Sequence, residues 1–225
     1  GNQNLESVLD GARVSALTFC TQTARRDQSK IEVCNRVEDL LHPTARETLK
    51  YVNISDGLEI HYDGDLPAQS GVGSSSAFTV GLLNALHAFK GNEVSAHELA
   101  RDGIHIEQDL VKEQVGSQDQ VSAAFGGFNR VEFKSDGEIL VRPVSADVTR
   151  IKLLNKYLML FYTRIVRTAS TIAKSYVPEL SSKRAQLCRM SDMVDEALAI
   201  LTGTGSLDAF GELLDEGWME KRSLG

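Results

Sequence analysis

Cysteine and proline are scarce in this sequence. Its 225 residues include only three cysteines and four prolines. Cys20, Cys34 and Cys188 lie far apart without C-x-x-C spacing, which argues against a zinc site and is typical of reduced cytosolic thiols. No apolar run approaches the roughly 20 residues that cross a bilayer, and the first residues lack the features of a secretory signal. We therefore expect a cytoplasmic protein without a membrane partner.

A net positive charge is also missing. Lysine and arginine number 24 against 31 aspartates and glutamates, which gives a formal net charge of -7. Sequence-independent binding of nucleic acid needs a basic face, so this balance argues against a nucleic-acid partner. The net charge does not exclude a small anionic ligand, because local backbone dipoles can outweigh a distant net charge. With 42% hydrophobic residues, the chain can bury one substantial core or two smaller subdomains that share a cleft.

Hydrophobic periodicity predicts both strands and helices. Strands are expected at 12–23, 30–35 and 58–65, in a hairpin of 127–134 with 138–144, and at 152–163, where a helix is the alternative. Helices are expected at 44–52, 74–89, 95–111 and 117–125, and as a pair between 180 and 222 that is interrupted at 203–206. Strand-rich and helical stretches alternate in blocks rather than strictly. The sequence therefore predicts an α+β fold rather than a doubly wound sheet.

The segment "DLPAQSGVGSSSAF" (65–78) places two spaced glycines and three consecutive serines at the start of an apolar helix. A helix N-terminus has about four unpaired N–H groups and a partial positive charge. Gly71 and Gly73 allow these groups to converge on a phosphate without a Cβ in the way, and the serines add hydroxyls. The segment lacks the lysine of GxxxxGK[ST] and the third glycine of GxGxxG. It predicts a phosphate-binding loop, with a plain turn and serine N-cap as the alternative.

A serine hydrolase is a second interpretation of the same residues. "GSSSA" approaches the GxSxG motif, with Ser75 at its centre. This chemistry needs a histidine within reach of the serine. His87 and His105 lie on predicted helices with no motif around them, and the loop is longer than a nucleophile elbow. We therefore keep the hydrolase as the least favoured alternative.

Two carboxylates decide between these interpretations. Glu107 lies near the end of one predicted helix and Asp119 at the start of the next, with Gly116 preparing a turn between them. Phosphoryl transfer to a hydroxyl requires one carboxylate for a metal and a second for the substrate proton. Each acid alone is typical of a solvated surface. Together with the loop, they favour phosphoryl transfer.

The run from Pro67 through Gly71, Gly73 and three serines to Ala77 resembles the P-x3-GLGSSAA phosphate loop of the GHMP kinases, which include galactokinase, homoserine kinase and mevalonate kinase. The segment from Glu107 to Asp119 matches the second element of this family. "EQVGSQDQVSAAFGGFN", "FYTRIVRTAS" and "EGWMEKRSLG" are similar to the bacterial D-glycero-D-manno-heptose 7-phosphate kinases. The resemblance extends over most of the chain.

The resemblance implies a two-subdomain GHMP kinase fold. It implies an N-terminal ATP-binding domain at 1–145, like ribosomal S5 domain 2, and an incomplete helical or ferredoxin-like C-terminal domain at 146–225. The "GGGTD"-like substrate loop and the "GAGGGG" loop of the family have no counterpart here. The resemblance therefore implies a chain truncated at both ends.

It further implies ATP and Mg²⁺ as cofactors. Ser75 and Glu107 would hold Mg²⁺, and Asp119 would orient or deprotonate the acceptor hydroxyl. The residues expected to surround the ATP phosphates are Pro67, Gly71, Val72, Gly73, Ser74, Ser75 and Ser76. The residues expected toward the substrate are Gly116, Gln118 and Arg167.

The implied reaction is ATP-dependent phosphorylation of the anomeric hydroxyl of a sugar phosphate, giving a heptose 1,7-bisphosphate. A kinase for another sugar, such as fucose or galactose, and an inactive GHMP-fold binding protein are the alternatives. Arg164 stands where relatives usually carry glycine. Its side chain would either contact the substrate phosphate or point into solvent. The oligomeric state is not fixed by the sequence, and a homodimer is compatible with it.

Overall fold

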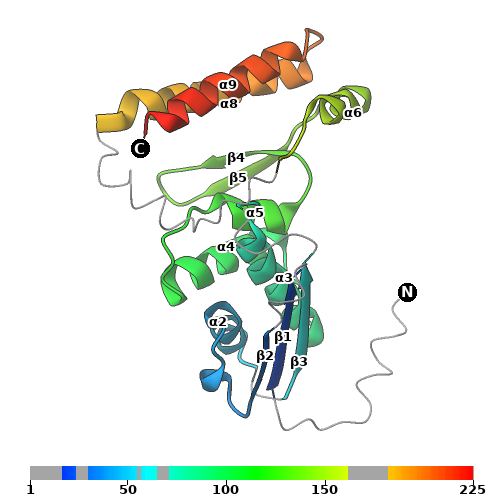
Figure 1. Ribbon diagram of the computed structural model, residues 1–225, viewed down its shortest axis with the longest axis vertical. Coiled ribbons are helices and arrows are strands. Elements are labelled where there is room, and N and C mark those ends of the chain that lie inside the picture. Colours follow the sequence, from blue (N-terminus) through cyan, green and yellow to red (C-terminus); the bar gives the residue numbers. More distant parts are fainter. Residues whose placement is uncertain (1–16, 24–29, 55–56, 65–70, 162–181, 225) are drawn as a thin grey trace. The chain divides into compact units, whose positions relative to one another are not determined.

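A computed structural model describes residues 17–23, 30–54, 57–64, 71–161 and 182–224 (Figure 1). The chain divides into two compact units, Gly1–Phe125 and Gly126–Gly225. Each unit contains its own strands and helices, in agreement with the predicted α+β class. Within the described ranges, no helix has the length and apolar character needed to cross a membrane. The domain boundary predicted after residue 145 remains a prediction.

The first unit contains a three-stranded mixed sheet with the order β2-β1-β3. Its strands are β1 (Leu17–Thr23), β2 (Lys30–Cys34) and β3 (Glu59–Gly64). β1 pairs antiparallel with β2, Leu17 opposite Cys34, and parallel with β3, Thr18 opposite Glu59. A parallel pair needs a crossover, and the helical segment between β2 and β3 supplies it. All three strands were predicted, although residues 12–16 of the first lie outside the described residues.

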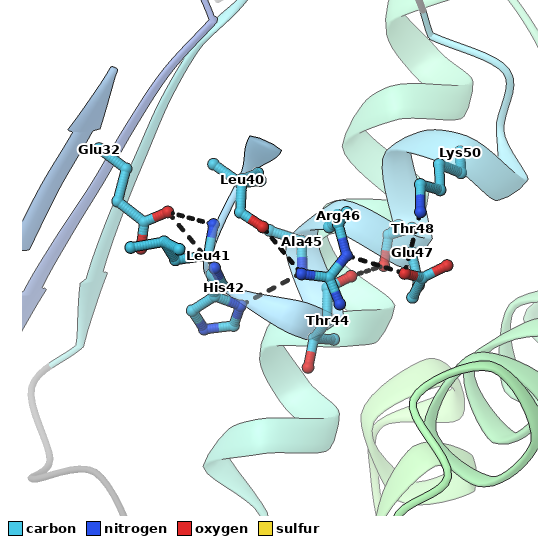
Figure 2. A network of polar contacts seen from close by, with 10 residues as sticks. All are labelled: Glu32, Leu40, Leu41, His42, Thr44, Ala45, Arg46, Glu47, Thr48 and Lys50. Atoms are coloured by element: carbon cyan, nitrogen blue, oxygen red, sulfur yellow. Dashed lines mark hydrogen bonds and ion pairs between the residues drawn. The ribbon is translucent and has the colours of Figure 1, made fainter. Parts of the chain in front are cut away.

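Glu32 ties β2 to the start of α2 (Pro43–Tyr51), as Figure 2 shows. Its Oε2 accepts hydrogen bonds from the backbone N–H groups of Leu41, at 2.7 Å, and His42, at 3.3 Å. His42 is the N-cap of α2, and its Nδ1 accepts from the N–H of Ala45 at 3.2 Å. Pro43 follows at the first helical position, where its missing N–H costs nothing. These contacts place the beginning of α2 at Pro43, one residue before the predicted start.

The described part of the first unit also contains a short 3-10 helix, Val37–Asp39, and three more α-helices, of which α3 packs against α2 and both of the others. They are α3 (Ser74–Phe89), α4 (Ala96–His105) and α5 (Gln118–Phe125). Apolar residues at helical spacing form a stripe along α3, and the stripe is buried except for Phe89, the last residue of the helix, which is 49% exposed. Its members are Phe78, Leu82, Leu83, Leu86 and Phe89. The core cluster around α3 contains Leu40, Leu49, Phe78, Leu82, Leu83, Leu86, Leu99 and Ile106. This packing fixes the N-terminus of α3 relative to α4 and α5.

Ser95 and Glu98 form a capping box at the start of α4. The Ser95 hydroxyl accepts from the Glu98 N–H at 3.2 Å, and the Glu98 carboxylate accepts from the Ser95 N–H at 2.9 Å. These reciprocal bonds satisfy two backbone donors of the kind that a helix N-terminus leaves unpaired.

Among its described residues, the second unit contains the predicted hairpin and three α-helices. The strands β4 (Asn129–Phe133) and β5 (Ile139–Pro143) pair antiparallel, with Val131 opposite Val141. The helices are α6 (Val148–Tyr157), α8 (Arg184–Thr202) and α9 (Asp208–Arg222). A small core of Leu154, Leu201 and Leu207 joins α6 to the α8–α9 pair.

The strand predicted at 152–163 is wrong where the structure describes it. Residues 152–157 belong to α6, and 158–161 have no regular secondary structure. The helix begins after Asp147, whose carboxylate accepts from the N–H groups of Thr149, at 2.8 Å, and Arg150, at 3.3 Å. An aspartate in this position stabilises a helix start and has no equivalent role in a strand. Residues 162–163 lie outside the described ranges.

Candidate active site

The glycines of the predicted phosphate loop adopt left-handed backbone conformations. Gly71 has φ of +80° and Gly73 has φ of +72°, a region that favours glycine. Gly73 is the N-cap of α3, so the helix begins at Ser74. The backbone N–H groups of the three serines therefore lie in the first turn, where the helix offers them no partner. Pro67 lies outside the described residues.

The side chains of the loop differ in exposure. Val72 is 47% exposed and Ser75 is exposed, whereas Ser74 is half-buried and Ser76 is buried. This alternation follows from the helical turn, because neighbouring residues point about 100° apart. Ser75 therefore lies on the solvent side of the first turn, and Ser76 on the side that faces the unit's interior.

Glu107 reaches the interior from a π-helical turn. α4 continues directly into this turn, Ile106–Leu110, in which the Val111 N–H donates to the Ile106 carbonyl at 2.8 Å. π-helical turns in proteins frequently mark functional sites, because the extra residue per turn redirects side chains. Glu107 is 1% exposed. The sequence predicted a regular helix here, and the π turn is a finding of the structure.

Three side-chain donors surround the buried Glu107 carboxylate. The Ser76 hydroxyl donates to Oε2 at 3.0 Å, and the Gln120 amide donates to the same oxygen at 2.5 Å. The Thr79 hydroxyl donates to Oε1 at 2.6 Å. A buried carboxylate is costly unless donors satisfy it, and these three do so from α3 and α5. The described contacts do not join Glu107 to Ser75, and the expected role of Ser75 remains a prediction.

Neither Thr79 nor Gln120 was predicted as a site residue from the sequence. Both are fully buried, at 0% exposure. Thr79 interrupts the apolar stripe of α3 one turn after Ser76, and Gln120 immediately follows Asp119. A polar residue inside an apolar stripe was the available signal. This signal could be interpreted only after the structure showed that Thr79 contacts the Glu107 carboxylate.

Asp119 lies beside the phosphate loop. It belongs to the first turn of α5, and it is exposed. A Cβ added to Gly73 would lie 3.3 Å from Asp119 Cγ and 3.4 Å from its Oδ2. Because Gly73 has no side chain, the Asp119 carboxylate can lie next to the backbone of the phosphate loop. The structure thus brings the loop and both predicted carboxylates together in one unit.

The residues around Glu107 suit a small, hard cation. The available ligands are carboxylate and hydroxyl oxygens, which Mg²⁺ prefers. The buried Gln120 Oε1 also has no hydrogen-bond partner among the described residues. Nowhere in the described part of the chain do three or more His, Cys, Asp or Glu side chains group to hold a metal. A cation here would therefore complete its shell with water and ligand phosphates, as Mg²⁺ commonly does.

A second carboxylate, Glu113, lies close to Glu107. The Glu113 N–H donates to the Glu107 backbone carbonyl at 2.9 Å. The Glu113 residue is exposed, but partial desolvation of its carboxyl group, followed by the negative charge of Glu107, raises the pKa of Glu113 above its usual range. Glu113 was not predicted as a site residue, because its position depends on the turn that follows the π segment.

The predicted substrate residues fall at the start of α5 or outside the described chain. A Cβ on Gly116 would lie 3.4 Å from Gln118 Oε1, and Gln118 is exposed. The Gln108 amide donates to the Val115 carbonyl at 2.9 Å and to Ser117 Oγ at 3.2 Å, which holds the turn before α5. Arg167, like Arg164, lies outside the described residues.

The hydrolase alternative gains no geometric support. No hydrogen bond among the described residues joins Ser75 to His87 or His105. His105 Nδ1 instead pairs with Asp109 Oδ2 at 2.7 Å, and the ring nitrogens of His87 are buried without a partner in the described chain. A serine nucleophile needs a base in hydrogen-bond reach.

Residues 35–127 match the family model of the GHMP kinases N terminal domain. This match places residues 35–127 in the GHMP kinase superfamily. The matched segment runs from the end of β2 through the phosphate loop, Glu107 and Asp119 to Gly127. The superfamily assignment made from the loop and the two carboxylates is confirmed.

The chain is similar to a D-glycero-alpha-D-manno-heptose 7-phosphate kinase of Campylobacter jejuni. The two are 27% identical over 167 residues, which cover 73% of this chain and 49% of the relative. The chain thus spans about half the length of that relative.

Two solved structures share the fold. A D-glycero-D-manno-heptose 1-phosphate kinase from Bacteroides thetaiotaomicron has a TM-score of 0.64 at 20% identity, covering 91% of this chain and 63% of that one. A mevalonate kinase also has a TM-score of 0.64, at 19% identity, covering 95% of this chain and 68% of that one. The predicted GHMP kinase fold is therefore confirmed.

Proposed function

We propose that this protein is an ATP-dependent kinase that phosphorylates the anomeric hydroxyl of a sugar phosphate. D-glycero-D-manno-heptose 7-phosphate is the leading substrate, and the product is the 1,7-bisphosphate. One observation carries the proposal: the exposed Asp119 carboxylate lies directly against Gly73, where α3 begins. A carboxylate for a hydroxyl proton thus adjoins a helix N-terminus suited to phosphate. The similarity to a heptose 7-phosphate kinase supports the choice of sugar.

In the proposed reaction, the acceptor oxygen forms a bond to the γ-phosphorus of ATP, and the bond to the bridging β–γ oxygen breaks. ADP leaves, and Asp119 takes the hydroxyl proton. The N–H groups in the first turn of α3 bind phosphate oxygens and hold the γ-phosphate in line. Glu107 and Ser75 would hold Mg²⁺, which, when bound, offsets charge on the phosphates.

The remaining assignments are part of the same proposal. Under this proposal, Pro67 and Val72 would contact the ATP phosphates, and Gly116, Gln118 and Arg167 would contact the sugar. A kinase for fucose or galactose would use the same loop and carboxylates with different sugar contacts. An inactive binding protein would need neither Glu107 nor Asp119.

The test measures ADP formation by the intact protein with heptose 7-phosphate, galactose, fucose and mevalonate as acceptors. We expect turnover with the heptose phosphate. Asp119→Asn should lower the rate by about 10² to 10⁴ and leave ATP affinity nearly unchanged, since an amide cannot take the proton. Asp109→Asn is the matched control, because Asp109 is an exposed carboxylate paired only with His105 among its described contacts.

Turnover with another acceptor would change the substrate and keep the kinase. If Asp119→Asn retained more than about a tenth of the wild-type rate, Asp119 would not be the base. No ADP formation with any acceptor, together with retained ATP binding, would support the inactive binding protein.

A further inference from the structure

Thr79 and Gln120 are the two fully buried polar side chains next to the proposed reaction centre that the proposed mechanism leaves without a role. Thr79 lies on α3, one turn beyond the phosphate loop. Gln120 lies in the first turn of α5, adjacent to Asp119 in the chain. Burying polar groups costs stability unless they are hydrogen-bonded, so their contacts explain why they are there.

Both side chains donate to Glu107, one to each carboxylate oxygen. Thr79 Oγ1 lies 2.6 Å from Oε1, and Gln120 Nε2 lies 2.5 Å from Oε2. Thr79 Oγ1 is also 3.1 Å from the Ser75 carbonyl. The hydroxyl has a single hydrogen, and the shorter contact, with the charged acceptor, takes it. Donors on both oxygens fix the plane of the carboxylate as well as its position.

Gln120 additionally links Glu107 to Asp119. Its hydrogen bond holds the first turn of α5 against the π-helical turn that carries Glu107. Asp119 precedes Gln120 on that turn and lies against Gly73. Any shift of Gln120 away from Glu107 would therefore also move Asp119 relative to the phosphate loop.

We infer that Thr79 and Gln120 are positioning residues for the divalent cation site. They fix the Glu107 carboxylate in one orientation before a cation binds, and Gln120 also fixes the separation between Glu107 and Asp119. The inference rests on the proposed function. Such outer contacts typically change metal affinity by about 10- to 100-fold when removed.

The test measures Mn²⁺ affinity by electron paramagnetic resonance in the presence of ATP and without an acceptor. Thr79→Val keeps the side-chain shape and removes the hydroxyl, whereas Thr79→Ser keeps the hydroxyl. We expect Thr79→Val to weaken Mn²⁺ binding about tenfold or more, and Thr79→Ser to restore it. Gln120→Met should weaken it similarly, while Ser122→Met, at an exposed position of α5, should not.

Turnover separates the two roles. Saturating Mg²⁺ should restore the rate of Thr79→Val, because Thr79 acts only through Glu107. It should not restore the rate of Gln120→Met, because Asp119 is displaced as well. A residue that merely satisfied a buried charge would lower stability and leave Mn²⁺ affinity unchanged.

The outcomes distinguish this inference from the proposed function. If wild-type protein bound neither ATP nor Mn²⁺-ATP, the proposed function would fail. If wild type bound Mn²⁺-ATP and the folded Thr79→Val and Gln120→Met variants bound it equally well, the inference would be overturned and the kinase would stand. If Thr79→Val did not fold, the comparison of Mn²⁺ affinity between Gln120→Met and Ser122→Met would decide the inference.

Discussion

At the scale of single residues, the close approach of Gly73 and Asp119 joins the phosphate loop to the proposed catalytic carboxylate. An alanine there would take a left-handed φ of +72° and would press its Cβ against Asp119. We expect Gly73→Ala to cost about 1–2 kcal/mol of stability, because the left-handed conformation disfavours a Cβ. We also expect turnover to fall roughly tenfold or more, since small displacements of a reacting group are costly.

Gly91 provides the matched control at the opposite end of α3. Its φ is +74°, and a Cβ there would meet nothing within 4 Å. Gly91→Ala should therefore cost a similar amount of stability and leave turnover unchanged. Urea denaturation and steady-state rates of both variants check this. Equal rates for the two variants would contradict the assigned place of Asp119.

The charged residues of the candidate site were predicted from the sequence, but the neutral residues that contact Glu107 were not. The glycines, Glu107 and Asp119 were recognisable because their residue types and order carry chemistry. Thr79 and Gln120 were not, since a threonine or glutamine is ordinary on any helix. The contact between Ser76 and Glu107 was equally out of reach, because three consecutive serines differ only by their rotation about the helix axis.

At the scale of elements, Arg150 joins α6 to the C-terminal end of α8. Its Nε lies 3.1 Å from both the Ile200 and Leu201 carbonyls, and its Nη2 lies 2.5 Å from the Ile200 carbonyl. These carbonyls lack partners within the helix, and a cation at a helix C-terminus is favourable. Arg150→Met keeps most of the apolar stem and removes the donors.

We expect Arg150→Met to make the last turn of α8 exchange its amide hydrogens about tenfold faster, which corresponds to about 1.4 kcal/mol. Lys152→Met, at an exposed position of the same helix, should have no such effect. Hydrogen exchange followed by mass spectrometry of residues 196–203 measures both. Unchanged exchange in Arg150→Met would mean that these bonds add nothing to the end of α8.

The α6 segment explains why one element was predicted wrongly. An apolar run such as "KLLNKYLMLFYT" fits a strand and a helix about equally well. The decision depends on contacts far along the chain, with Leu154 packing near Leu201 and Leu207 and Arg150 bonding to α8. Helices with a local signal, such as α4 with its Ser95–Glu98 capping box, were predictable without such contacts.

At the scale of the whole molecule, fold class and superfamily could be read from the sequence. Strand and helix blocks indicated α+β, and the loop with its two carboxylates indicated the GHMP kinases. The domain boundary after residue 145 stays a prediction, because the end of a domain depends on contacts in the folded chain that no local sequence pattern records. A homodimer and a cytoplasmic location remain predictions.

The proposed function requires the N-terminus of α3 and Glu107 to bind Mg-ATP together. Thermal unfolding of the intact protein with ATP, in Mg²⁺ and in EDTA, measures this binding. A ligand at about 100 times its Kd stabilises the folded state by about 2.7 kcal/mol, which raises the Tm by a few degrees. We predict this rise for wild type in Mg²⁺ and a much smaller one in EDTA. In Glu107→Gln, we expect ATP to raise the Tm by the same amount in Mg²⁺ as in EDTA. A wild-type Tm that ignored saturating Mg-ATP would contradict the claim.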